Sequence, residues 1–253
     1  YRRLTTFDSE SLPAPDLARW ELLSPTHYRF TLGEEGRDFS DGSRLTSADV
    51  KATFDSVLDP ATGSPHRATL AIIQEITIEG PDRLDIQLRE PDPLFPAYLG
   101  LGILPADLIQ SGHAFAVAPV GSGPLSLESW PQPGRLILKR RGDGQVLELL
   151  TVKDPNVRVM KLLRGEIDLL QNDLPPELIG FLRGRDEVRV ERAPGVNFSY
   201  LGFNLEDPVT GLPQVRQALA YAIDRAEILR YLLQGDGRLA VGLFPPEHWA
   251  ASR

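Results

Sequence analysis

The side chains most often used for catalysis and metal binding are sparse in this sequence. Its four histidines, His27, His66, His113 and His248, stand far apart, and none forms an HxxxH or HxH pair, the spacings that bring two imidazoles to one metal ion. Cysteine is absent, which excludes disulfides, thiol nucleophiles and cysteine-ligated zinc or iron–sulfur clusters. The sequence therefore predicts no cofactor and no local metal site. Only ligands that converge from distant segments would make one.

Two further patterns have the residue types of an active site without its spacing. Residues 120–124 read VGSGP, but a nucleophile elbow needs GxSxG followed by a helix, and here proline follows. The acidic pairs Glu34–Glu35 and Glu166–Asp168 have the residue types of acid–base catalysis, yet charged pairs at strand ends are usually solvated. The sequence favours a protein that is not an enzyme.

The first half of the chain is predicted to combine strands, a helix and a hairpin. Thr46 is a suitable N-cap for an amphipathic helix over 47–58, which the proline and glycine of residues 59–65 end. Gly80-Pro81-Asp82 is a turn between two alternating segments and predicts a β-hairpin. The predicted strands are 28–32, 72–79, 83–88, 126–128, 135–140 and 146–152, and short helices are expected at 94–99 and 105–109.

The pattern changes after residue 156, where helices and strands alternate, as in an α/β lobe. One predicted helix begins at residue 156, and three others cover 176–182, 215–223 and 226–233. The predicted strands are 167–169, 188–190 and 197–204.

Composition limits the class of protein and its partners. The 253 residues carry 35 acidic and 27 basic side chains and a formal charge of −8, so the net field repels nucleic acid and anionic lipid. No apolar run approaches the roughly 20 residues that span a bilayer, and the first residues do not form a signal-peptide core. We expect a folded protein whose export signal, if it has one, was removed or lies outside this chain.

Seven segments resemble the signature of the family 5 bacterial extracellular solute-binding proteins, in order and in spacing. They are PDLARWE at 15–21, YRFTL at 28–32, FSDGSRLTSADV at 39–50, PVGSGP at 119–124, GEIDL at 165–169, YLGFN at 200–204 and VRQALAYAIDR at 215–225. Together these segments extend over nearly the whole chain.

The resemblance implies an α/β fold, namely a periplasmic-binding-protein-like class II lobe with an additional α+β subdomain. Residues 1–118 would form the smaller α+β subdomain, and residues 119–239 part of lobe I without its N-terminal strand. Residues 240–253 would begin the crossover to a second ligand-binding lobe, which is missing here because family members are longer. We therefore expect this chain alone to bind its solute weakly or not at all.

The implied function is capture of an oligopeptide or dipeptide-like solute for an ABC importer, with a nickel complex as a further candidate. The partner would be the ABC permease in the membrane, and the location periplasmic or membrane-anchored outside the cytoplasm. By position, the ligand-binding residues would be His66, Asn172, Asp173 and Tyr200. The alternative for His66, Asn172 and Asp173 is an ordinary solvated side chain, which carries about equal weight in the case of His66, and the alternative for Tyr200 is packing in the core.

Two alternatives come from other classes of protein. Similar domains follow an N-terminal DNA-binding domain in cytoplasmic transcriptional regulators, where they sense a metabolite, and the start of the full-length gene product would discriminate. A hydrolase is the weakest alternative, because no triad or metal spacing is present.

Overall fold

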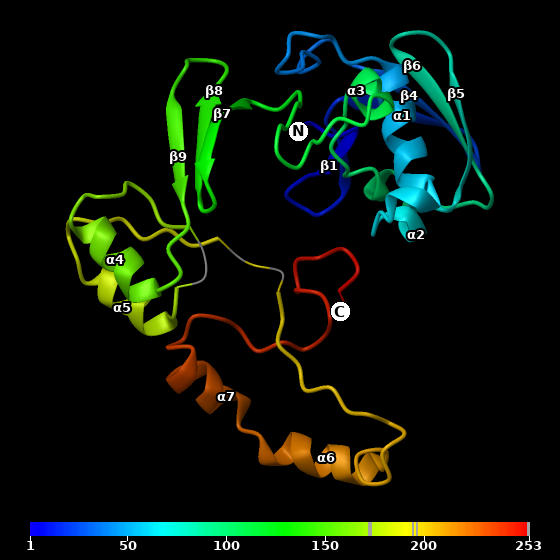
Figure 1. The fold of residues 1–253 in the computed structure, drawn as a ribbon. Helices are drawn as coiled ribbons and strands as arrows, with labels where there is room; N and C mark the ends of the chain where they lie inside the picture. Colours follow the sequence, from blue (N-terminus) through cyan, green and yellow to red (C-terminus); the bar gives the residue numbers. More distant parts are fainter. Residues whose placement is uncertain (172–173, 194, 196, 252–253) are drawn as a thin grey trace. The chain divides into compact units, whose positions relative to one another are not determined.

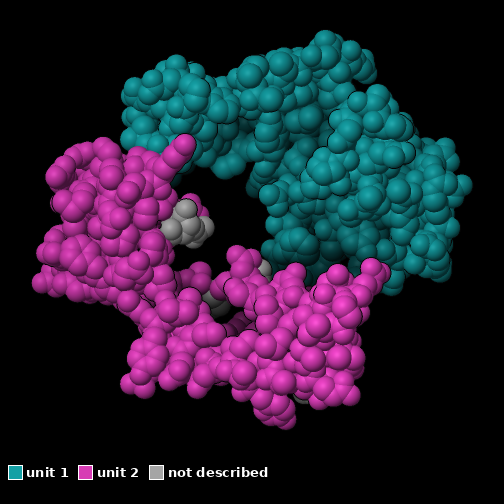
Figure 2. All heavy atoms as spheres, turned by 60° about the horizontal axis from the view of Figure 1, so that its bottom comes forward, with its two compact units in different colours: residues 1–151 teal, residues 152–253 magenta. Residues whose placement is uncertain are grey.

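The structure is a computed structural model that describes residues 1–171, 174–193, 195 and 197–251. The chain forms two compact units, residues 1–151 and 152–253, which Figure 2 shows in different colours. Each unit is described by itself below.

A four-stranded antiparallel sheet forms the centre of the first unit (Figure 1). Its strand order is β3 (Ala18–Ser24), β4 (His27–Leu32), β6 (Arg83–Leu88), β5 (Ile73–Ile78). One face is buried, because Tyr28 pairs with Ile86 and Phe30 with Leu84 and all four side chains are in the core. The opposite face is polar, as expected for an antiparallel sheet with one solvated side. The predicted hairpin and the strand at 28–32 are confirmed.

Helix α1 (Ser47–Leu58) adds Val50 and Phe54 to this core. A capping box begins it: Ala48 N donates to Thr46 Oγ1 at 3.3 Å, and Thr46 N donates to Asp49 Oδ2 at 2.7 Å. These two bonds satisfy amide groups that the first turn leaves free. The predicted helix over 47–58 is confirmed at both ends.

Shorter elements complete the four-stranded part of this unit. They are β1 (Thr5–Phe7), β2 (Pro13–Pro15), α2 (Arg67–Leu70), α3 (Ala106–Gln110) and 3-10 turns at Pro60–Thr62 and Phe95–Tyr98. Phe95 is fully buried and packs on Tyr28, with ring centroids 5.3 Å apart. The short helices predicted at 94–99 and 105–109 are therefore confirmed in place.

The loop over residues 33–45, which we call the bridging loop, is fixed by a buried arginine. Arg37 is only 2% exposed. Its Nη2 lies 2.6 Å from Asp82 Oδ1 in the hairpin turn, and its Nε donates to the Leu45 carbonyl at 2.8 Å. A buried guanidinium is tolerated only when its donors are paired, so Arg37 holds the loop against the sheet.

A second sheet, antiparallel and three-stranded, follows in the order β7 (Leu125–Gln132), β8 (Arg135–Arg140), β9 (Val146–Leu150). It confirms the strands predicted between 126 and 152. The register places six leucines on one face, Leu125, Leu127, Leu136, Leu138, Leu147 and Leu149. None of them is fully buried.

Helices are the regular elements found among the described residues of the second unit. Its helices are α4 (Pro155–Leu163), α5 (Pro176–Arg183), α6 (Pro213–Ala222) and α7 (Arg225–Glu227), the last continuing as a π-helix over Ile228–Leu232. Asp154 caps α4 by accepting from Asn156 N at 2.7 Å and Val157 N at 3.1 Å. These elements confirm the helices predicted in this half.

The strands predicted at 167–169, 188–190 and 197–204 are not strands in the described structure. No backbone–backbone hydrogen bond is found among the described residues between 186 and 204. A strand forms only where a neighbour takes its backbone hydrogen bonds. The prediction was wrong for this chain because alternation in sequence says nothing about whether such a neighbour exists.

Replacement of the buried arginine tests the bridging loop. Arg37→Ala should lower the free energy of unfolding by about 2–4 kcal/mol, because it leaves a cavity and unpaired carbonyls. Arg44→Ala is the matched control: Arg44 lies in the same loop, is half-exposed and pairs only with Glu34 and Asp38, so its loss should cost about 0–1 kcal/mol. Urea unfolding measures both, and equal losses would contradict the proposed role of Arg37.

The polar face of the four-stranded sheet should give the protein a pH-dependent stability. Arg29 donates to both oxygens of Asp85 at 2.8 Å, and His27 Nε2 lies 3.1 Å away. The Arg29 hydrogen bonds, and less strongly that of His27, hold the pKa of Asp85 below its ordinary value. A lowered folded pKa stabilises the protein above the unfolded value of about 3.9, and this contribution is lost as the pH falls through the folded pKa.

Asp85→Asn should therefore cost about 1–3 kcal/mol at neutral pH, the usual effect of losing hydrogen bonds to a charged group. The difference from the wild type should shrink as the pH falls below about 4. Urea unfolding at a series of pH values measures it. A difference that stays constant down to low pH would refute the assignment.

Candidate functional site

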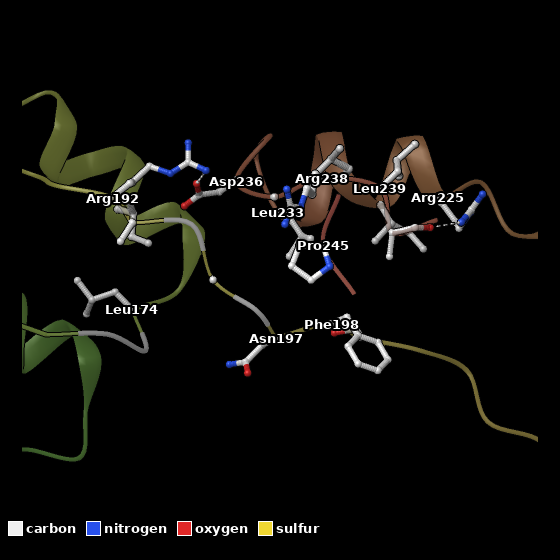
Figure 3. Close-up of a pocket in the computed structure, with 18 of the residues that line it drawn as sticks. Leu174, Arg192, Asn197, Phe198, Arg225, Leu233, Asp236, Arg238, Leu239 and Pro245 are labelled. Carbon is white, nitrogen blue, oxygen red and sulfur yellow. Dashed lines mark hydrogen bonds and ion pairs between the residues drawn. The ribbon is translucent and has the colours of Figure 1, made fainter. Parts of the chain in front are cut away.

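A concave surface in the second unit has a volume of about 2440 Å³. Figure 3 shows this hollow, which is bounded by α5, by the segment after it, and by the chain that follows the π-helix. The residues labelled there are Leu174, Arg192, Asn197, Phe198, Arg225, Leu233, Asp236, Arg238, Leu239 and Pro245.

Apolar side chains dominate the lining of the hollow. Ile179 and Leu182 come from α5, Leu229 and Leu233 from the π-helix and its end, and Leu239 from the chain beyond it. Small-molecule pockets usually measure about 300–1,000 Å³, so the hollow is more than twice the size that one small solute needs. An apolar surface of this size commonly marks a site of interaction.

The arginines that line the hollow are used within the second unit. Arg192 Nη2 lies 2.7 Å from Asp236 Oδ1, and Arg225 Nη1 donates to the Ala240 carbonyl at 3.1 Å, as Figure 3 shows. Of the remaining three, Arg189 pairs with Glu191 and Arg238 pairs with Glu247. The third, Arg216, donates to the carbonyls of Thr210 and Gly211. These guanidinium groups hold segments of the unit together and leave no free cation in the described lining.

Two aromatic rings stand next to each other on the segment predicted as the strand 197–204. Phe198 and Tyr200 have ring centroids 5.6 Å apart and both line the hollow. Tyr200 is 79% exposed. Phe198 was not among the predicted site residues, although alternate positions on an extended segment lie on the same side. The spacing of two between Phe198 and Tyr200 is the signal from which Phe198 could have been predicted.

The predicted ligand residues are distributed over both units. His66 is an exposed residue of the first unit at the start of α2, and its backbone N–H donates to Ser64 Oγ at 3.3 Å. Tyr200 belongs to the second unit. Asn172 and Asp173 lie outside the described residues. The structure brings Tyr200 together with Phe198, and a role for His66, Asn172, Asp173 or Tyr200 in solute binding stays a prediction.

One member of each acidic pair that resembled catalytic carboxylates is engaged in an ion pair. Lys161 Nζ lies 2.6 Å from Glu166 Oε2, and this hydrogen bond lowers the pKa of Glu166. Glu34 pairs with Arg44 at 2.7 Å. A general acid at neutral pH needs the opposite, a raised pKa. In the part of the chain that the structure describes, no three His, Asp or Glu side chains gather where they could hold a metal ion.

The family is established by comparison with known proteins. Residues 13–253 match the family described as bacterial extracellular solute-binding proteins, family 5 Middle. The chain belongs to this family. Its members are binding proteins of transport systems and are not enzymes, which agrees with the residue analysis.

Curated relatives match almost the full chain but only about half of their own length. The "Probable di/tripeptide-binding protein 5" of Pseudomonas aeruginosa is 27% identical and aligns with 99% of this chain and 54% of the relative. "Protein XP55" of Streptomyces lividans is 32% identical over 85% of this chain and 41% of its own. The "Glutathione-binding protein GsiB" of Escherichia coli K12 is 28% identical over 97% and 50%.

Solved structures agree on the fold. NikZ from Campylobacter jejuni, in complex with Ni(L-His), superimposes with a TM-score of 0.85 at 25% identity, over 100% of this chain and 53% of that protein. DppA from Helicobacter pylori, in complex with the peptide STSA, has a TM-score of 0.80 at 23% identity, over 98% and 55%. Both are mixed α/β proteins of the family 5 type, so the fold class predicted from the sequence is confirmed at this level.

Proposed function

We propose that this chain is part of a solute-binding protein that captures a peptide-like solute outside the cytoplasm and delivers it to an ABC permease. The observation that carries the proposal is the family match over residues 13–253. The relative from Pseudomonas aeruginosa, named as a di/tripeptide-binding protein, supports peptide as the class of solute. The main chain of such a peptide would be held by hydrogen bonds, and its side chains by pockets that accept several residue types.

The complete cleft would have two lobes, of which this chain supplies one together with the smaller subdomain. The length of the relatives supports this, because the chain spans about half of each. The hollow of the second unit supports it too, since an apolar face of that size is costly to leave in water. In this proposal further polypeptide of the same protein covers most of the hollow, and the solute binds between the lobes.

Within this arrangement residues 1–118 form the smaller subdomain, residues 119–239 the partial lobe I, and residues 240–253 the start of the crossover. His66 and Tyr200 would face the solute, as would Asn172 and Asp173. Closure of the lobes would exclude water from the ligand, and tighter binding to the closed form would drive that motion.

A nickel complex is the second candidate solute, favoured by the likeness to NikZ, whose structure contains Ni(L-His). The alternative of a metabolite-sensing domain in a transcriptional regulator gains no support from the relatives named above. None of the described helices is long and apolar enough to cross a membrane. The periplasmic relatives support an extracytoplasmic location.

The two-lobe proposal makes a direct prediction about affinity. Isothermal titration calorimetry with di- and tripeptide mixtures should show binding to this chain at least about a hundredfold weaker than to a longer form that contains the second lobe, because half of the enclosure is missing. Tight binding by the 253 residues alone would show that they already contain a complete cleft.

His66 gives a second test, made in the longer form. His66→Ala should weaken solute binding by about 1–3 kcal/mol, the cost of leaving a desolvated polar partner unpaired, with little effect on the melting temperature. Thr69→Ala, a change at another exposed position of α2, is the matched control and should leave affinity unchanged. Equal affinities for the two variants would make His66 an ordinary loop histidine.

A further inference from the structure

The four-stranded and the three-stranded sheets of the first unit are packed separately. The hydrophobic core of this unit consists of residues between Leu4 and Ile103, and no residue of β7, β8 or β9 belongs to it. The three-stranded sheet therefore gains little from burial, and its position on the unit must depend on a small number of polar contacts. Residues 119–124, which lead into β7, form the covalent connection.

Close packing against Tyr1 holds this connection in place. A Cβ atom on Gly121 would lie 2.6 Å from Tyr1 Cδ1, and one on Gly123 would lie 2.9 Å from Tyr1 N. Only glycine fits at such distances. Ser40 N also donates to the Gly121 carbonyl at 3.0 Å. The connection thus has one fixed point, and one fixed point does not define the angle of the sheet that follows.

Arg141 supplies the second contact. It stands in the turn between β8 and β9, and its Nη1 and Nη2 donate to the carbonyls of Asp38 and Phe39 at 2.6 and 3.3 Å. Its own N–H donates to the Pro124 carbonyl at 2.9 Å. One guanidinium therefore gives the end of the three-stranded sheet that adjoins the connection a second contact with the bridging loop, more than a hundred residues earlier in the sequence.

The two arginines that contact the bridging loop differ in how easily water can take over their hydrogen bonds. Arg37 is buried, and Phe39 and Leu45 anchor the same loop in the core. Arg141 is exposed, so water competes for its hydrogen bonds and each contributes little net stability. The loop is a fixed part of the four-stranded subdomain, and the contact that breaks first is the one to the three-stranded sheet.

We propose that residues 119–124 are a pivot and that Arg141 is a latch, which together set the angle between the three-stranded sheet and the four-stranded core. Release of the latch lets the sheet turn about the pivot without unfolding either part. The proposal concerns motion within residues 1–151. It does not depend on the proposed solute capture, so a negative result for one proposal leaves the other untouched.

The absence of cysteine allows a direct measurement, because two introduced cysteines are the only sites for spin labels. Thr77→Cys on β5 and Ser129→Cys on β7 are exposed positions in the two sheets. Double electron–electron resonance on this labelled chain should give one narrow distance distribution. Adding Arg141→Ala should raise the population with a second label-to-label distance, in which the sheet has turned, on the order of ten-fold. This is the equivalent of losing about 1.4 kcal/mol.

Arg140→Ala is the matched control. Arg140 is the preceding residue and equally exposed, but its guanidinium binds Asp143 and Gln145 within its own turn, so the distribution should stay narrow. Arg141→Lys keeps the charge but cannot donate as a planar fork, and an intermediate distribution is expected. Circular dichroism and the urea midpoint confirm that each variant is folded.

Two results would overturn the proposal. If Arg141→Ala is folded and keeps the narrow distribution of its parent, other contacts hold the sheet and Arg141 is no latch. If the labelled parent already shows a broad distance distribution, and neither Arg140→Ala nor Arg141→Ala changes it, there is no latched state to release.

Discussion

Backbone groups of an extended segment must find hydrogen-bonding neighbours, and this requirement shapes both units. In the first unit the strands β3 to β6 satisfy one another, and their apolar faces meet helix α1 and Phe95 in a single core. In the second unit the described part of residues 186–204 has no such neighbour. The helices α4 to α6 form there nonetheless, because a helix satisfies its backbone internally.

The same contrast explains which elements could be predicted from the sequence. Helix α1 has its signals within a few residues, the Thr46–Asp49 capping box and the Asp59-Pro60 end, and the hairpin has its turn at Gly80-Pro81-Asp82. Residues 197–204 alternate as a strand does, but pairing depends on chain far away. Arg37 was not predicted, because nothing near it in sequence indicates that Asp82 will lie 2.6 Å away.

The candidate site divides in a similar way. The class of protein followed from motifs spread over the chain, and the comparison over residues 13–253 agrees with it. The particular ligand residues came only from positional resemblance, since His66 and Tyr200 have no local signature of binding. Phe198 shows that alternation can identify a neighbour of a predicted residue on the same segment, although it does not say whether the two rings meet solute or protein.

Charge pairing separates residues that hold the protein together from residues available for recognition. The arginines of the hollow, the carboxylate of Glu166 and the guanidinium of Arg37 all have partners within their own units. A group already paired must give up that partner before it can bind a ligand, at a cost similar to what the new contact returns. In the proposed two-lobe arrangement, affinity for a solute would then come mainly from enclosure by a second surface. The proposal therefore combines a chain that is well folded around its first sheet with binding energy that would depend mostly on polypeptide closing over the ligand.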